Sequence, residues 1–283
     1  MEGVVDRKWV FDMQESVSPQ YAIHPRRSQL QRWLTPRLAR VEGQTLHKAG
    51  RVVFTAETNR RAYIDAGLAD AECTHHIPFF YDAGVFAERR AEEPGFKIGY
   101  FGNFDLRGHR NPATFLKSLA GFLAAHPEAR ESTRFIFHGD WLPHHDALLD
   151  ELELRDISHI HGSVSFSEYL ENVRTSPVLL LEAAAEHNLF VPSKVVEYLG
   201  AGRPVLAFVP ENSEVAGVLR QAGMSDYLCE VGDVDGGIRT IERLWQRYLA
   251  HELSPESMRT EEWSSTRQIP RYLDLLRKSQ EDA

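Results

Sequence analysis

The sequence predicts an α/β protein built from parallel sheets, and three observations lead to that prediction. Short apolar runs alternate with amphipathic stretches along nearly the whole chain, which is the pattern of parallel strands joined by helices. The run at 205–209 is apolar on both faces, as in a strand buried inside a parallel sheet. A charged stretch at 87–95 ends in Pro94 and Gly95 and indicates a linker. Two domains are therefore expected, covering residues 1–92 and 93–265.

The first domain is expected to begin with a strand at 8–12 and to continue with a long helix over 29–48. Further elements follow from the same alternation: a strand at 51–55, a helix at 57–66 and an extended segment at 76–81. The long helix is predicted by apolar side chains that recur at helical spacing, namely Leu30, Trp33, Leu34, Leu38 and Val41.

The second domain alternates more regularly. Ser165 and Glu168 have the spacing of a capping box, in which each side chain bonds the backbone N–H of the other residue, so a helix is expected to start there. The remaining elements are expected as strands at 97–101, 134–138, 157–161, 178–181, 205–209 and 227–229, with helices starting near 112, 146, 193, 213, 234 and 267.

Composition limits the function classes. The chain has 283 residues, 42% of them hydrophobic, and a net charge of −9, which argues against a basic surface for nucleic acid. Cys73 and Cys229 offer no disulfide framework and the N-terminus does not resemble a signal peptide, so a cytoplasmic protein is expected. No run approaches the roughly 18 apolar residues needed to cross a bilayer, so any membrane contact would be peripheral.

The most informative segment is VPSKVVEYLGAGRPVLAF, residues 191–208. Ser193 is placed to cap a short helix, whose free N–H groups suit an anion together with Lys194. Glu197, one turn further on, can accept hydrogen bonds from hydroxyl groups. This spacing favours a site for a nucleoside diphosphate, although a capped helix with solvated charges explains it equally well.

The segment resembles the donor-binding loop and helix of GT-B glycosyltransferases, in particular the retaining, group 1-like enzymes. Three other stretches match that family in order and spacing: FKIGYFGNFD at 96–105, FIFHGD at 135–140 and ISHIHGSV at 157–164. The resemblance implies a complete Rossmann-like donor domain over 93–265, preceded by a partial Rossmann-like domain over 1–92. It also implies that the terminal helix, 266–283, packs back on the first domain through Ile269, Leu273 and Leu276.

The first domain resembles only part of its counterpart in the family. RKWVFDMQES at 7–16 is similar to a strand and loop from the middle of that domain, so its first part is expected to be absent. An incomplete sheet exposes an edge and an apolar face, which makes a complementing N-terminal chain or a homodimer the expected partner.

The resemblance assigns roles to individual positions. Ser193 and Lys194 match the place where the diphosphate meets the helix, and Glu197 matches the glutamate that binds ribose hydroxyls. The other donor-site candidates are Gly102 and Asn103 beneath the phosphates, Arg107 and Arg110 as diphosphate-neutralising arginines, and Gly139, Gly162 and Val164 around the base. The two arginines are equally well explained as solvated loop residues.

One position departs from the family. Many retaining members carry a second glutamate eight residues before the ribose glutamate, where this chain has Leu189; Asn188 and His187 are its polar neighbours. Lys194 and Arg107 would stabilise charge on the leaving diphosphate. Asp12, at a strand end, is the candidate general base if the reaction inverts, with structural capping as the alternative.

The expected function is transfer of a sugar from a UDP- or GDP-linked donor to a hydroxyl of a glycan or lipid-linked acceptor, in polysaccharide biosynthesis. The family implies no cofactor and no bound metal, and no nucleic-acid partner is expected. A non-catalytic nucleotide-sugar-binding subunit, or pseudoenzyme, is the alternative favoured by Leu189 and by the short first domain. A sugar-nucleotide epimerase shares the fold, but no pocket of acid/base residues for it is found.

Overall fold

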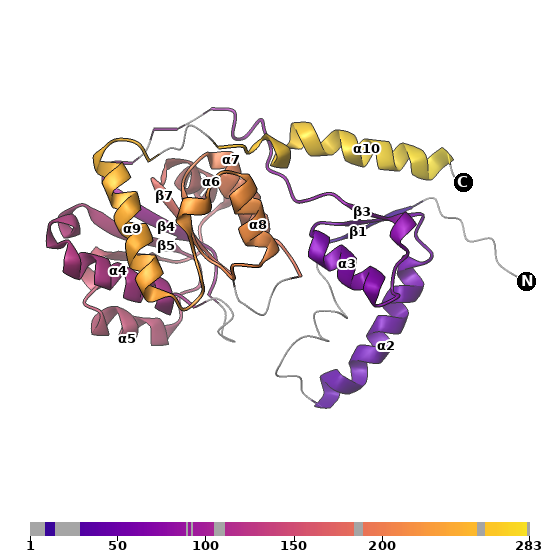
Figure 1. The fold of residues 1–283 in the computed structure, drawn as a ribbon, viewed down its shortest axis with the longest axis horizontal. Coiled ribbons are helices and arrows are strands. Elements are labelled where there is room, and N and C mark those ends of the chain that lie inside the picture. Colours follow the sequence, from indigo (N-terminus) through magenta and orange to yellow (C-terminus); the bar gives the residue numbers. More distant parts are fainter. Residues whose placement is uncertain are drawn as a thin grey trace, which may run out of the picture. The chain divides into compact units, whose positions relative to one another are not determined.

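The computed structural model describes residues 9–14, 29–88, 90–91, 93–104, 111–183, 189–253 and 258–281. The chain divides into two compact units (Figure 1). The first contains the described residues up to Asp82, together with 189–193 and 261–281; the second contains those from Ala83 to 183 and from Lys194 to Thr260. The two boundaries, after Asp82 and after Thr260, lie earlier in the chain than the predicted boundaries at 92 and 265. The segment 189–193 also belongs to the first unit, which the sequence did not indicate.

The first unit is built on a three-stranded parallel sheet in the order β1-β2-β3, so β1 is an outer strand of the described sheet. Val10 pairs with Arg51, and Val52 pairs with Thr74. Its elements are β1 (Val10–Met13), α2 (Gln29–Leu46), β2 (Arg51–Phe54), α3 (Glu57–Asp65), η1 (Ala71–Cys73), β3 (Thr74–His76), η5 (Glu261–Trp263) and α10 (Ser265–Glu281).

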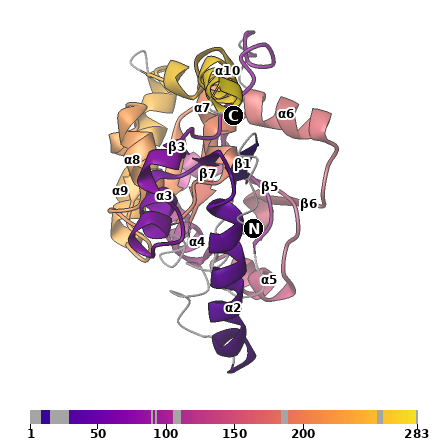
Figure 2. The same cartoon turned by 90° about the vertical axis from the view of Figure 1, so that its right-hand side faces the viewer.

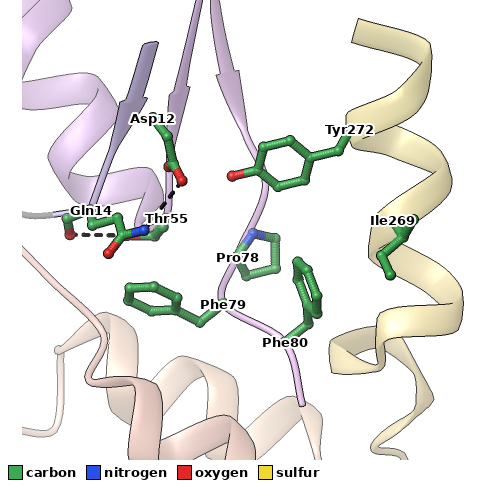
Figure 3. Close-up of a pocket in the computed structure, with 8 residues that line it drawn as sticks. All are labelled: Asp12, Gln14, Thr55, Pro78, Phe79, Phe80, Ile269 and Tyr272. Carbon is green, nitrogen blue, oxygen red and sulfur yellow. Dashed lines mark hydrogen bonds between the residues drawn. The ribbon is translucent and has the colours of Figure 1, made fainter. Parts of the chain in front are cut away.

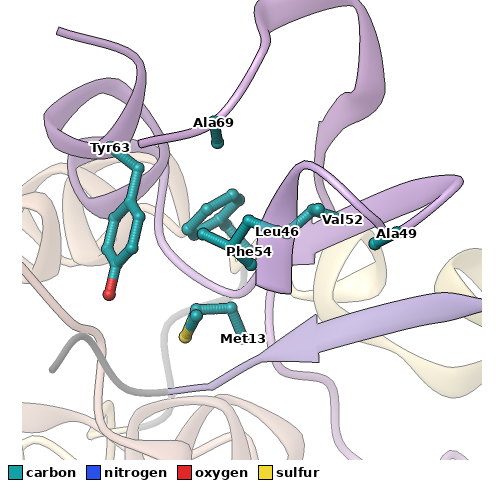
Figure 4. Packing of buried hydrophobic residues seen from close by; sticks show 7 residues of the cluster. All are labelled: Met13, Leu46, Ala49, Val52, Phe54, Tyr63 and Ala69. Carbon is teal, nitrogen blue, oxygen red and sulfur yellow. The ribbon is translucent and has the colours of Figure 1, made fainter. Parts of the chain in front are cut away.

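Successive strand residues point to opposite faces of a sheet, and in this sheet both faces are covered. Val52 and Phe54 pack with Leu46 of α2 and Tyr63 of α3 (Figure 4). Val53, between them, points to the other face, where it packs with Ile77 and with Leu275 of α10; Val10 and Tyr272 join this cluster.

α10 faces the sheet with different residues from those expected. Leu275 is 7% exposed, whereas Ile269, Leu273 and Leu276 are 45%, 46% and 45% exposed. The terminal helix thus belongs to the first unit, where Ile269 lines a pocket, but Leu273 and Leu276 remain about half exposed. Consecutive residues of a helix are about 100° apart, so a predicted face that includes Leu276 instead of Leu275 is turned away from the sheet.

The second unit contains a six-stranded parallel sheet in the order β6-β5-β4-β7-β8-β9. From β4 the chain moves outward through β5 to β6, then returns to place β7 on the other side of β4. The sheet therefore has a topological switch point between β4 and β7, and ligands of such sheets bind beyond the carboxyl ends of the strands at that point. The strands are β4 (Phe96–Phe101), β5 (Thr133–His138), β6 (Ser158–His161), β7 (Val178–Glu182), β8 (Val205–Phe208) and β9 (Leu228–Cys229).

Helices cover both faces of this sheet (Figures 1 and 2). The capping box expected at α6 is confirmed: Ser165 N–H donates to Glu168 Oε2 at 3.0 Å, and Glu168 N–H donates to Ser165 Oγ at 3.3 Å. The helices are α4 (Ala113–Ala125), η2 (Pro127–Glu131), α5 (Pro143–Glu151), η3 (Arg155–Ile157), α6 (Phe166–Thr175), α7 (Ser193–Ala201), α8 (Glu214–Gln221), η4 (Ser225–Tyr227) and α9 (Val234–Leu249). Within the described part of the chain, no helix combines the length and apolar character needed to cross a membrane.

Candidate functional site

Lys194, in the first turn of α7, lies at the switch point of the second sheet. Its Nζ donates a hydrogen bond to the carbonyl oxygen of Phe101, the last residue of β4, at 2.9 Å. The same ammonium group lies 4.5 Å from the centre of the Tyr100 ring, within range of a cation–π interaction. A positive charge is thus held at the carboxyl end of a central strand, where an anionic ligand would meet it.

Position 102, directly after β4, requires glycine. Gly102 has φ of +143°, a backbone conformation that side-chain-bearing residues rarely adopt. A Cβ at this position would also lie 2.4 Å from Nζ of Lys194. Gly102 therefore allows the lysine to approach the loop, and it leaves the backbone open to a ligand.

The loop after β5 is locked to the loop after β4. Gly139 has φ of +144°, and a Cβ there would lie 2.1 Å from the carbonyl oxygen of Gly102. Asn103 Oδ1 accepts a hydrogen bond from the Asp140 N–H at 2.9 Å, and the Gly102 N–H donates to the His138 carbonyl at 2.9 Å. The side chain of Asn103 therefore fixes the two loops to each other.

Glu197, the candidate ribose-binding residue, is half-buried one turn after Lys194 and is held by a side chain that sequence reasoning missed. Tyr169 of α6 donates its hydroxyl hydrogen to Glu197 Oε2. Burial raises the pKa of the Tyr169 hydroxyl, and the nearby Tyr198 and Glu197 raise it further. Tyr169 therefore stays protonated at neutral pH and remains a donor to the carboxylate.

Glu182, the last residue of β7, is a second acid that sequence reasoning missed. It is 5% exposed, and both carboxyl oxygens are buried with no hydrogen-bond partner among the residues that the structure describes. Burial raises the pKa of Glu182 well above its ordinary value, while the positive charge of Lys194 acts in the opposite direction. Burial thus favours the protonated form of Glu182, which can donate a hydrogen bond. The only signal in the sequence is a glutamate that directly follows the apolar run VLLL.

An aromatic row crosses the carboxyl ends of β4, β5 and β6. The His138 ring stacks on His161 with a centroid distance of 4.7 Å and on Phe101 at 5.7 Å. Burial, and then the nearby His161, lower the pKa of His138, so its ring is neutral. Beyond β6, Gly162 has open space where a Cβ would project, and Val164 is half-buried.

Ser193 does not occupy the helix-capping position expected from the sequence. Since α7 begins at Ser193, this residue lies inside the first helical turn and does not occupy the preceding cap position. Ser193 and Leu189 belong to the segment 189–193 of the first unit. The remaining predicted residues, Arg107, Arg110 and Asn188, lie outside the described residues.

Asp12, the predicted general base, lines a pocket of the first unit (Figure 3). Asp12 Oδ2 accepts a hydrogen bond from Gln14 Nε2 at 3.3 Å, and Thr55 Oγ1 donates to the Gln14 carbonyl at 3.1 Å. The hydroxyl of Tyr272 points toward Asp12, and its pKa is raised by burial and by that carboxylate. The cavity has a volume of about 330 Å³ and is completed by four mostly apolar side chains, Pro78, Phe79, Phe80 and Ile269.

Over the described ranges, no group of three or more His, Cys, Asp or Glu side chains is arranged to hold a metal ion. Cys73 and Cys229 are both free thiols, and Cys229 is buried.

Comparisons with known proteins support the fold. No protein-family model matches the chain, and no curated protein matches it in sequence. Among solved structures, a sucrose-phosphate synthase from Thermosynechococcus elongatus matches 98% of this chain and 69% of its own, with a TM-score of 0.65 and 16% identity. WaaG, a glycosyltransferase involved in lipopolysaccharide biosynthesis, matches 95% of this chain and 73% of its own, with a TM-score of 0.63 and 14% identity.

A third structure is the pneumococcal O-GlcNAc transferase GtfA in complex with UDP and GlcNAc, with a TM-score of 0.59 and 12% identity. The match covers 84% of this chain and 47% of GtfA, so the chain spans only about half the length of that enzyme. These neighbours are GT-B glycosyltransferases, and the chain shares their fold, with a parallel sheet in each unit. The predicted fold class is confirmed.

Proposed function

We propose that this chain is a glycosyltransferase that takes its sugar from a UDP- or GDP-linked donor. The observation that carries the proposal is Lys194, held against the glycine loop after β4, with Glu197 one helical turn beyond it. A helix start with a lysine suits a diphosphate, and a carboxylate at this distance suits the ribose hydroxyls. The fold shared with known glycosyltransferases supports the same conclusion.

Each donor-site residue has a proposed task. Gly102 and Asn103 pass beneath the diphosphate, and Lys194 stabilises the charge that builds on it as the sugar leaves. Gly139, Gly162 and Val164 surround the base, for which the neutral stacked ring of His138 offers an aromatic neighbour. Ser193, Arg107, Arg110 and Asn188 complete the proposed donor site.

The acceptor is proposed to bind in the pocket at Asp12. An acceptor hydroxyl that reached this carboxylate could pass its proton to Asp12, which makes Asp12 the general base if the reaction inverts. The rings of Phe79, Phe80 and Tyr272 suit the apolar face of a sugar or a lipid-linked acceptor. A glycan or lipid-linked acceptor in polysaccharide biosynthesis fits this chemistry, and no cofactor is needed.

The second candidate function is a non-catalytic subunit that binds a nucleotide sugar. It is favoured by Leu189, which stands where many retaining enzymes have a glutamate. Such a subunit would act with a complementing N-terminal chain or as a homodimer.

Calorimetric titration of the full chain with UDP, GDP and their sugar conjugates tests the donor site. We expect saturable binding of one nucleotide, weakened about tenfold or more by Glu197→Gln and by Lys194→Met, because each change removes a charged partner. Glu131→Gln is the matched control: Glu131 is exposed and precedes β5, at the opposite end of the sheet. No binding of any nucleotide would contradict the proposal.

A transfer assay then separates the two functions. With the donor identified, turnover that is lost in Asp12→Asn while donor binding is kept supports the enzyme. Tight donor binding with no turnover, alone or with an added partner chain, supports the binding subunit instead.

A further inference from the structure

Glu182 is a buried acid at the switch point of the second sheet, and the proposed donor chemistry gives it no task. It is the last residue of β7 and is 5% exposed. Neither of its carboxyl oxygens has a hydrogen-bond partner among the residues that the structure describes. A buried polar group without a partner destabilises the fold. Its place at the carboxyl end of a central strand, where ligands of such sheets bind, therefore indicates a task in binding.

The surroundings of Glu182 contain one opposite charge. β7 lies between β4 and β8 in the sheet. Glu182 pairs with Phe208 of β8, a strand with no titratable side chain. The one charged residue of β4, Lys97, lies near the start of that strand, at the far end of the sheet. Among the described residues, Lys194 of α7 is the charged group that acts on Glu182.

Lys194 serves both Glu182 and the proposed ligand. Its ammonium group is held at the end of β4 by the Phe101 carbonyl at 2.9 Å, and the diphosphate of a sugar nucleotide is proposed to pair with this group. An ionised Glu182 would offset the positive charge that attracts the diphosphate, whereas a protonated Glu182 leaves that charge uncompensated. Burial favours the protonated form and Lys194 favours the ionised form, so the balance depends on what else pairs with Lys194.

We propose that Glu182 takes up a proton when a sugar nucleotide binds, and that it thereby couples donor affinity to pH. The proton comes from the solvent and forms an O–H bond on the Glu182 carboxylate, and no other bond changes. The negative charges of the diphosphate offset the charge of Lys194 and repel an ionised carboxylate, so the bound ligand raises the proton affinity of Glu182. By linkage, protonation of Glu182 raises the affinity for the ligand by the same factor. Glu182 is a positioning residue that acts through Lys194, and this inference rests on the proposed donor site.

Two histidines are the other groups near the site that a bound anion would help to protonate. His138 and His161 stack at the carboxyl ends of β5 and β6, with a centroid distance of 4.7 Å. A nearby negative charge favours the charged form of a histidine ring as it favours a protonated acid. Proton uptake alone therefore does not identify Glu182, but loss of that uptake on substitution of Glu182 does.

Calorimetric titration of the full chain with UDP- and GDP-linked sugars, in two buffers of different ionisation enthalpy, tests the proposal. The difference in heat between the buffers gives the number of protons taken up per ligand bound. Sugar nucleotides are used because, unlike UDP and GDP, they have no terminal phosphate group that itself titrates near neutral pH. We expect uptake of up to one proton per ligand, and an affinity that falls about fivefold or more as rising pH ionises Glu182.

Glu182→Gln keeps the size of the side chain but cannot titrate. This variant should bind the sugar nucleotide without the proton uptake, and its affinity should change little with pH. Glu182→Asp retains a carboxyl group at this position and should retain the uptake. The matched control is Glu131→Gln, an exposed acid at the opposite end of the sheet, which should behave as the unchanged chain does.

Equal proton uptake in Glu182→Gln and in the unchanged chain would assign the proton to another group, such as His138 or His161, and would overturn the inference. Binding of a sugar nucleotide with neither proton uptake nor pH dependence would overturn it as well, while leaving the donor site intact. Absence of binding by any sugar nucleotide would overturn the donor site and this inference together, so the two failures are distinguishable.

Discussion

The hydroxyl of Tyr169 on α6 donates a hydrogen bond to the carboxylate of Glu197 on α7. The bond uses one carboxylate oxygen, Oε2, and fixes the orientation of the side chain proposed to bind ribose. We expect Tyr169→Phe to leave the fold intact, because the ring keeps its edge contact with Phe101 at 6.1 Å. Nucleotide affinity should fall about three- to tenfold, since the carboxylate loses the donor that orients it. Calorimetric titration with the nucleotide measures this change in affinity.

Tyr248→Phe, a like change in the second unit beside Trp245, is the control and should leave affinity unchanged. If Tyr169→Phe binds nucleotide as tightly as the unchanged chain while Glu197→Gln does not, Glu197 needs no orientation by Tyr169.

Gly102→Ala should destabilise the second unit and weaken nucleotide binding. The added methyl group would meet Lys194 Nζ, and alanine rarely adopts φ of +143°. We expect the free energy of unfolding in urea to fall by about 1–3 kcal/mol. Gly162→Ala, where nothing lies within 4 Å of the new Cβ, should change it by less than about 0.5 kcal/mol. Equal stabilities for the two variants would contradict the geometry described for the loop.

Glu182 should make the stability of the protein decrease as pH rises. Burial raises its folded-state pKa well above the ordinary value of 4.5, so above that pH the folded protein keeps a proton that the unfolded chain has released. The folded state loses stability until the pH passes the folded-state pKa. Glu182→Gln keeps the size and neutrality of the acid without the proton, so we expect it to be more stable than the unchanged chain at neutral and alkaline pH.

Urea unfolding across a pH series checks this prediction. The advantage of Glu182→Gln should shrink as pH falls toward 4.5, where the unfolded glutamate also becomes protonated. A constant difference at all pH values would mean that Glu182 does not titrate as its burial requires. Glu131→Gln, on the surface, serves as the control.

Leu275 and Leu276 of α10 should respond differently to the same truncation. Leu275 is 7% exposed and packs with Val53 and Ile77, so Leu275→Ala should cost about 2–4 kcal/mol of unfolding free energy. Leu276 is 45% exposed, and Leu276→Ala should cost less than about 0.5 kcal/mol. The reverse order would show that α10 meets the sheet with the face first expected from the sequence.

The sequence was sufficient for the fold class and for the local signals. Strand β8, Val205–Phe208, lies within the predicted strand 205–209 and is apolar at every position because both faces of its sheet are covered. The Ser165–Glu168 spacing predicted a capping box that the structure contains. Gly102 and Gly139 were singled out by the resemblance of their loops to the GT-B family, and both have positive φ at the end of a strand.

Helix orientation and distant partners could not be obtained in the same way. α10 has apolar residues on two adjacent faces, so periodicity alone does not decide between Leu275 and Leu276. Tyr169 and Glu182 are separated from α7 along the chain, and only the sheet order brings them to Glu197 and Lys194. Their roles depend on burial, which a single sequence does not report.

α2 packs on the sheet through Leu46 and leaves Leu30, Trp33 and Val41 exposed on its outer face, which has a practical consequence for handling the protein. Thr35, Gly43 and Leu46 are buried, whereas substitutions at the exposed Leu30, Trp33 and Val41 should leave the folded core unchanged. A chain with a fully polar outer face should therefore express and fold normally, yet adhere less to detergents and hydrophobic resins. That form is the one to concentrate for crystallisation, and the unchanged chain is the one to study in cells.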